Sequence, residues 1–326
     1  MHMNSKVSFI STVSQYRSAI MGLSMLSIML FHQCFTSSIP FNLFHNFGYW
    51  GVDIFLFLSG MGLVKSLNNN SLNVYYLHRF KRIIPSCLLC GSMKYTFFIL
   101  LGSSVVILRD GLNIGIWSIM SLDLWFIPTI IILYAISPLL YQFLSKWTCF
   151  TITIVLLVFF FNGFFIKPKV GYDWLSPIGI FAWTTERLPV FLAGMFIVMR
   201  RDWIDGKIRY SIPFLIAAIG LVFLEKTEMA FQGIQACRYF ALMIGMPALI
   251  SLSIITIKKI PNKFQWTINF FGIYSLELYL VHEFIFWSLK VIYDNVNPFI
   301  LLILGFLLSC LSAYICKRLI EKFKWQ

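Results

Sequence analysis

The feature that most constrains this chain is a series of long apolar blocks separated by short polar segments. A helix of about 20 apolar residues matches the thickness of a bilayer's hydrocarbon core. We count ten such blocks, at residues 18–36, 47–65, 83–108, 124–144, 149–166, 186–199, 210–225, 237–257, 267–289 and 298–316. The sequence therefore predicts an all-α polytopic membrane protein with about ten transmembrane helices, forming a single domain over residues 1–326 with no appended soluble domain.

The positions of the basic residues predict an orientation. With the N-terminus in the cytoplasm, eighteen of the 26 Lys and Arg residues fall in inner segments and seven in outer ones, as the positive-inside rule requires. The remaining one, Lys94, falls within the third block, inside the bundle. Both termini are therefore expected to be cytoplasmic. The net charge of +13 does not indicate a nucleic-acid partner, because the charges occur in short clusters between apolar blocks.

Two ionisable residues mark the first block, Arg17 at its start and His32 near its predicted outer end. An ionisable side chain in a membrane span is costly, so a functional role is the default hypothesis. An imidazole takes up and releases protons near neutral pH, which suits a general base. The alternative is a histidine hydrogen-bonded in the bundle core. Arg17 and His32 would lie about 22 Å apart along one helix, facing a shared cavity or opposite ends of a long ligand.

Other charged residues occur at the edges of the blocks or inside them. Asp53 lies within the second block, where it could orient an imidazole, hold a substrate hydroxyl, or pair with an arginine as a structural anchor. Arg79 and Arg82 lie in a basic inner loop just before Pro85. They could bind the phosphates of a ligand, or they could set topology and contact lipid headgroups.

The later blocks carry further candidates, each with a structural alternative. Glu186 and Arg187 are expected at the outer face, where they could bind a substrate, although a plain salt bridge would also explain them. Trp125 could stack on a ligand or anchor the membrane interface. In the ninth block, His282 is a better candidate than Glu277, and the two are five residues apart and share no helix face. Cysteines 87 and 90 form a C-x-x-C that no second pair completes, so we predict core packing and no metal site.

Taken together, six segments resemble one known family. They are a first-span arginine and histidine, Gly51-Val-Asp-Ile-Phe-Leu-Phe-Leu-Ser-Gly60, Arg82-Ile-Ile-Pro85, Leu124-Trp125-Phe126, Arg187-Leu-Pro-Val-Phe-Leu-Ala-Gly194, and Ser275 through His282 with Tyr279. In this order, the chain resembles the membrane-bound acyltransferase family 3, which includes O-antigen and peptidoglycan O-acetyltransferases. The family pattern puts the arginine eleven residues before the histidine, where this chain has Met21, and Arg17 lies one turn deeper.

The resemblance implies an essential first-span histidine and acyl transfer from a cytoplasmic acyl-CoA, most simply acetyl-CoA, to a hydroxyl of an envelope polysaccharide or lipid-linked glycan. Because His32 is expected near the outer end of its span and the basic cluster at the inner mouth, we expect the acyl group to cross the membrane through the protein, directly or by way of a transient acyl-enzyme; an acceptor on the cytoplasmic side is the alternative. We expect catalytic roles for His32, Arg17 and Asp53, acyl-CoA contacts from Arg82, Arg79 and Trp125, and acceptor contacts from Glu186, Arg187 and His282. The expected surroundings are the cytoplasmic (inner) membrane of a bacterium.

Two other functions remain open from the sequence. The first is a non-enzymatic transporter of polysaccharide or lipid-linked sugar, although no pair of repeated halves with interrupted helices is visible. The second is an acyltransferase remnant that serves as an assembly partner. The sequence leaves the acyl group, the acceptor sugar and the oligomeric state undetermined.

Overall fold

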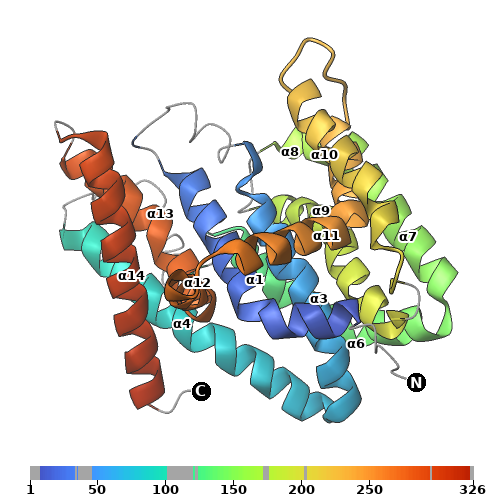
Figure 1. The fold of residues 1–326 in the computed structure, drawn as a ribbon, viewed down its shortest axis with the longest axis horizontal. Coiled ribbons are helices and arrows are strands. Elements are labelled where there is room, and N and C mark those ends of the chain that lie inside the picture. The colour runs from blue at the N-terminus through green and yellow to red at the C-terminus, as the bar shows by residue number, and fades with distance from the viewer. Residues whose placement is uncertain are drawn as a thin grey trace.

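A computed structural model describes residues 8–33, 35, 46–100, 120–121, 124–171, 176–201, 204–293 and 296–323, and every regular element in these ranges is helical (Figure 1). In chain order the elements are α1 (Phe9–His32), α3 (Trp50–Asn69), α4 (Leu72–Leu100), α6 (Phe126–Lys146), α7 (Thr148–Phe161), the π-helical turn η1 (Asn162–Ile166), α8 (Lys167–Val170), α9 (Pro177–Met199), the 3-10 turn η3 (Ile208–Ser211), α10 (Ile212–Leu224), α11 (Ile234–Lys259), α12 (Asn262–Ile273), α13 (Ser275–Ile292) and α14 (Pro298–Lys322). The predicted all-α class is confirmed.

Six helical stretches are long and apolar enough to cross a membrane: α3, α6, α7 through α8, α9, α11 and α14. The stretch from η3 through α10 is apolar but shorter. Large apolar side chains face outward on these elements, among them Leu157, Ile216 and Leu307, which are more than half exposed. The chain is a multi-pass membrane protein in which lipid covers such surfaces. The count of ten spans is not confirmed by helix length and composition, and the cytoplasmic termini stay a prediction.

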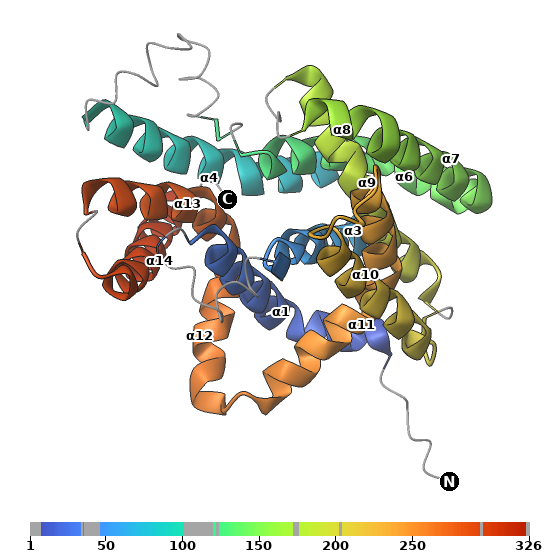
Figure 2. The same ribbon diagram turned by 90° about the horizontal axis from the view of Figure 1, so that it is seen from above.

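Helix α4 corrects one predicted boundary. The third span was expected to begin at 83, after a basic loop, but α4 begins at Leu72 and continues through Pro85. Arg79 and Arg82 therefore lie on a helix and not in a loop. Burial explains the early start, because Tyr75 is fully buried and its hydroxyl donates to the Tyr134 carbonyl at 3.2 Å. Seen from above, α4 lies in one layer with α6 and α7 (Figure 2).

Two further predicted boundaries are wrong. Helix α9 begins at Pro177, well before residue 186, because the Ser176 hydroxyl caps it by accepting from the Gly179 N–H. The sixth span is therefore long, and Glu186 lies mid-helix, while its place at the outer face stays a prediction. The ninth span is two helices, since the chain turns at Tyr274 between α12 and α13. The turn follows Gly272, where α12 lies directly against the Ser18 carbonyl of α1.

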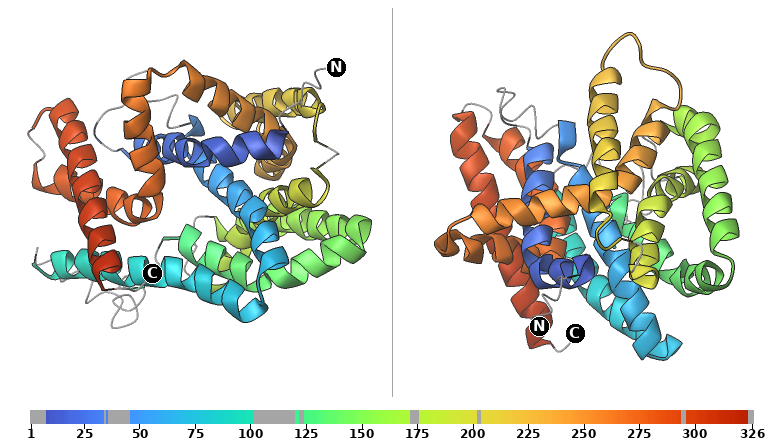
Figure 3. Two further views of the ribbon diagram at one scale, coloured as in Figure 1. Left: turned by 60° about the horizontal axis from the view of Figure 1, so that its bottom comes forward. Right: turned by 45° about the vertical axis from the view of Figure 1, so that its right-hand side comes forward.

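Helix α3 runs through the middle of the molecule, packed between α1 and α9 (Figure 3). Its approach to α9 depends on a reciprocal pair of glycines. A Cβ on Gly60 would lie 2.2 Å from the Phe191 carbonyl oxygen, and a Cβ on Gly194 would lie 2.1 Å from that of Phe57. The two backbones are therefore in contact, as small residues allow between membrane helices. This contact fixes α9, and with it the side chains that α9 carries toward the site.

Replacing Gly194 by alanine is expected to destabilise the protein by about 1–3 kcal/mol, because the added methyl group forces the α3 and α9 backbones apart. Thermal unfolding of the purified protein in nanodiscs would measure this. Gly220→Ala on α10 is the matched control, since a Cβ there meets nothing within 4 Å. Equal unfolding temperatures for the two variants would contradict the close packing of α3 on α9.

Candidate functional site

The two buried histidines that the sequence singled out meet in space. His32, the last residue of α1, places Nδ1 2.9 Å from Nε2 of His282 on α13. His282 is 1% exposed, and its Nδ1 lies 2.9 and 3.0 Å from the carbonyl oxygens of Leu278 and Tyr279. A carbonyl only accepts, so Nδ1 of His282 is the protonated nitrogen. Nε2 of a neutral His282 then accepts from Nδ1–H of His32, which assigns the unprotonated nitrogen of His32 to Nε2.

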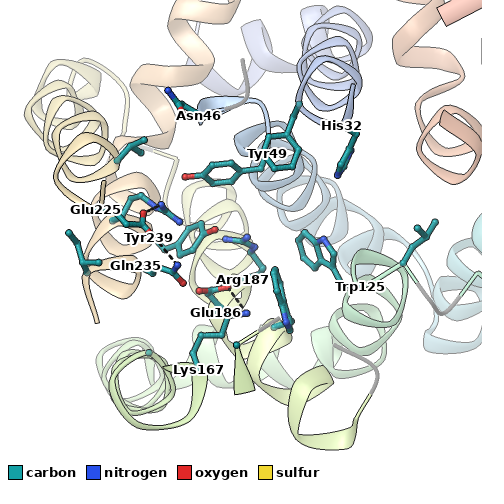
Figure 4. Close-up of a pocket in the computed structure, with 18 of the residues that line it drawn as sticks. His32, Asn46, Tyr49, Trp125, Lys167, Glu186, Arg187, Glu225, Gln235 and Tyr239 are labelled. Atoms are coloured by element: carbon teal, nitrogen blue, oxygen red, sulfur yellow. Dashed lines mark hydrogen bonds and ion pairs between the residues drawn. The ribbon is translucent and has the colours of Figure 1, made fainter. Parts of the chain in front are cut away.

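His32 also lines a cavity of about 1240 Å³. Figure 4 shows His32 on one side of this cavity and Lys167, Glu186 and Glu225 on the other, with Tyr49 between them. The walls come from α1, α9, α11, α13 and the segment from η1 to α8. The volume exceeds that of an ordinary small-molecule pocket, so two reactants can meet in it.

Asp53 and Arg187 form a buried ion pair between α3 and α9. Oδ1 of Asp53 lies 3.5 Å from an Nη of Arg187, and the side chains are 0% and 3% exposed. The Arg187 guanidinium also lies 3.9 Å from the ring centre of Tyr239 and 5.1 Å from that of Trp125. The side chain that contacts the His32 ring is His282. Asp53 instead contacts Arg187, as expected for a structural anchor paired with an arginine.

Lys167 is a site residue that the sequence analysis counted only as an outer-loop charge. It is 7% exposed, and its Nζ lies 3.6 Å from Oε2 of Glu186 and 3.1 Å from the ring centre of Trp183. The preceding π-helical turn begins at Asn162, whose side chain donates to the Ala182 carbonyl at 3.0 Å. Such turns are frequent at functional sites. The available signal was this asparagine, which interrupts an otherwise apolar block.

Arg238 is the second residue that the sequence analysis missed. On α11 it forms a hydrogen-bonded ion pair with Glu225, which also accepts from the Gln235 side-chain amide at 2.8 Å. All three residues line the cavity, as does Tyr49. The Arg238 guanidinium lies 5.1 Å from the ring centre of Tyr49. The sequence analysis counted Arg238 only among the charges that predict the membrane orientation, because its partner Glu225 belongs to a different predicted span.

Arg17 lies within α1, about 22 Å from His32 along the helix. Its guanidinium donates to the Leu58 carbonyl at 3.0 Å and packs beside Gly62, where an added Cβ would be 3.5 Å away. The positive charge of Arg79 acts on it. Two arginines, one on α1 and one on α4, therefore concentrate positive charge far from the histidine pair.

Of the two α4 arginines, Arg79 is half-buried and Arg82 is exposed. The Arg79 guanidinium lies 5.8 and 5.7 Å from the ring centres of Tyr75 and Tyr134. The charge of Arg82 acts instead on Lys317 of α14. Arg79 therefore packs against aromatic rings of α4 and α6, whereas Arg82 is exposed.

The family comparison agrees with the resemblance described above. The acyltransferase domain of acyltransferase family 3 matches residues 19–318. The chain belongs to acyltransferase family 3. The searches of curated proteins and of solved structures found no match. The matched region includes both histidines and begins just after Arg17.

In this family 3 acyltransferase, the cavity gathers some of the predicted site residues and leaves others apart. His32, Trp125, Glu186 and Arg187 line it, together with Lys94, which is buried in the bundle as predicted. His282 and Asp53 support it through their contacts with His32 and Arg187. Among the described residues, the lining does not include Arg17, Arg79 or Arg82.

Two cysteines of the acyltransferase lie at positions typical of core packing. Cys87 and Cys90 are both buried in the hydrophobic core, as their spacing predicted. Across the described part of the chain, no group of three or more His, Cys, Asp or Glu is arranged to hold a metal ion.

Proposed function

We propose that this protein is an O-acyltransferase that moves an acyl group, most simply acetyl, from acyl-CoA to a hydroxyl of an envelope polysaccharide or lipid-linked glycan. The observation that supports this most is the contact of His32 with His282 at the wall of the cavity. Family membership accounts for acyl transfer, and the histidine pair offers a base where an acceptor can reach it. The proposed location is the cytoplasmic membrane of a bacterium.

In the proposed reaction, His32 acts through its unprotonated Nε2. The acceptor hydroxyl gives its proton to this nitrogen while its oxygen attacks the thioester carbonyl. The tetrahedral intermediate collapses as the C–S bond breaks, and the departing sulfur takes the proton from the His32 imidazolium. The products are an ester and coenzyme A with a free thiol. His282 holds the opposite ring nitrogen of His32 throughout, so the base keeps its orientation.

The proposed donor site lies around Arg17 and Arg79. Guanidinium groups bind phosphate oxygens through paired hydrogen bonds, and coenzyme A carries several phosphates. Arg17 and His32 are about 22 Å apart along α1, at 1.5 Å per residue. The extended arm of coenzyme A would bridge this interval and bring the thioester to the cavity. In the predicted orientation, the phosphates bind on the cytoplasmic side and the ester forms near the outer face.

The experiment that tests this function compares the O-acyl content of the envelope polysaccharide in cells that lack the gene and in cells that carry it again. We expect base-labile esters only where the protein is present, and mass analysis of the released acid identifies the acyl group. Purified protein in nanodiscs should also bind coenzyme A, measured by calorimetry. Equal ester content in both strains, with no acyl-CoA turnover by the purified protein, would contradict the proposal.

A further inference from the structure

Across the cavity from His32 lies a group of three ion pairs, here called the ion-pair cluster. Its members are Lys167–Glu186, Arg187–Asp53 and Arg238–Glu225. In five of the six side chains, less than a tenth of the surface is exposed. Each cation has its own carboxylate, so the cluster carries no net charge. Buried charges are retained at a cost in solvation, so a cluster of this kind calls for an explanation.

Some buried polar atoms of the cluster, and one of the cavity residue Tyr49, make no hydrogen bond within the described ranges. The hydroxyl of Tyr49, Nζ of Lys167 and Nε of Arg238 have no hydrogen-bond partner within the described ranges. All three residues line the cavity. Leaving such a buried group unsatisfied is costly, so a polar occupant of the cavity would be bound by these atoms.

Two tryptophans provide an apolar surface beside the cluster. The ring centres of Trp125 and Trp183 are 5.0 Å apart with an interplanar angle of 36°, and both side chains line the cavity. Lys167 and Arg187 lie over these rings. The cavity thus combines flat aromatic surfaces with neighbouring donors and acceptors. A pyranose ring has the matching chemistry, since it presents an apolar C–H face and a rim of hydroxyl groups.

We propose that the ion-pair cluster and the two tryptophans form the binding subsite for an uncharged sugar ring of the acceptor, whose reacting hydroxyl faces His32. This proposal rests on the proposed function. A hydroxyl both donates and accepts, so it can bond to a carboxylate and a cation of the same pair. A uronate or phosphate would instead bring a charge that no cluster cation is left to balance. The other charged residues of the lining, Lys94, Lys226 and Glu283, lie outside the cluster and are not part of the proposed subsite.

The first test removes one charge from the cluster. Lys167→Met is expected to lower the O-acyl content of the polysaccharide at least tenfold at matched membrane abundance, with the dissociation constant for coenzyme A within twofold of wild type. Lys169→Met is the matched control, because Lys169 lies on the same short helix and is exposed. Lys167→Arg, which keeps the charge, should restore part of the transfer.

The outcomes separate this proposal from the proposed function. Wild-type transfer by Lys167→Met would overturn the subsite, and so would a parallel loss of coenzyme A binding or of membrane abundance. If the wild-type protein itself adds no esters, the proposed function fails.

A second test asks which sugar carries the ester. Nuclear magnetic resonance of the polysaccharide from wild-type cells locates the acyl group. We expect it on a neutral hexose or an N-acetylhexosamine. An ester confined to uronic acid or phosphorylated residues would overturn the assignment of an uncharged sugar, while leaving O-acyl transfer itself intact.

Discussion

Replacing His32 by alanine is expected to reduce O-acyl transfer by about 10²–10⁴-fold, the usual contribution of a positioned general base. The physical reason is that Nε2 is lost at the cavity wall, whereas the donor region around Arg17 lies about 22 Å away along α1. The measurement is the initial rate of coenzyme A release by purified protein with the acceptor polysaccharide, together with the dissociation constant for coenzyme A. Binding should stay within about twofold of wild type, which would place the loss in the chemical step.

The matched control for this variant is His78→Ala, because His78 is exposed on α4. We expect wild-type rates for it. His282→Leu should give an intermediate loss, since Nδ1 of His32 then has no acceptor on α13. Wild-type rates for His32→Ala would exclude His32 as the base.

Breaking the Asp53–Arg187 pair from one side should have the largest effect on folding. Asp53→Asn or Arg187→Gln leaves a buried charge without its counterion, which costs about 3–5 kcal/mol. We expect each single variant to unfold at a much lower temperature in nanodiscs and to accumulate poorly in the membrane. The double variant removes both charges, so its loss should be smaller than the sum of the two single losses.

An exposed ion pair supplies the control for this cycle. Arg318 and Glu321 lie 3.1 Å apart with side chains 60% and 39% exposed. Arg318→Gln should therefore change stability by no more than about 1 kcal/mol. Strictly additive losses at Asp53 and Arg187 would show that the two charges do not stabilise each other.

The helical class could be predicted from the sequence, and the two histidines could be selected as candidates for the site. Hydrophobic length and rare ionisable residues are local properties, and both are visible without knowing the fold. Several boundaries were not predictable in this way. The early start of α4 depends on burial of Tyr75 against α6, and the break at Tyr274 follows the packing of α12 on α1. Such contacts join segments far apart in the chain.

The candidate site shows the same division. His32 and His282 were each identified, yet their contact joins residues 250 positions apart, and no periodicity relates them. Lys167 and Arg238 were counted only as charges that set orientation, because their partners lie on other elements. Asn162, a polar residue within an apolar block, was the local signal available for this part of the chain. The sequence thus identified Asp53, Glu186 and Arg187 of the ion-pair cluster, but not their partner Lys167 or the pair of Arg238 with Glu225.

The bonds behind His282 restrict where a proton can travel. Its Nδ1 faces the carbonyl oxygens of Leu278 and Tyr279, which cannot carry a proton onward. A proton that His32 takes from an acceptor hydroxyl therefore cannot leave through His282, and it returns to the cavity to depart with the thiol. In the proposed reaction, each turnover would therefore neither take up a proton from the surroundings nor release one to them. It would neither draw on the electrochemical gradient of the membrane nor dissipate it, so the acyl-CoA thioester alone would supply the free energy for esterification.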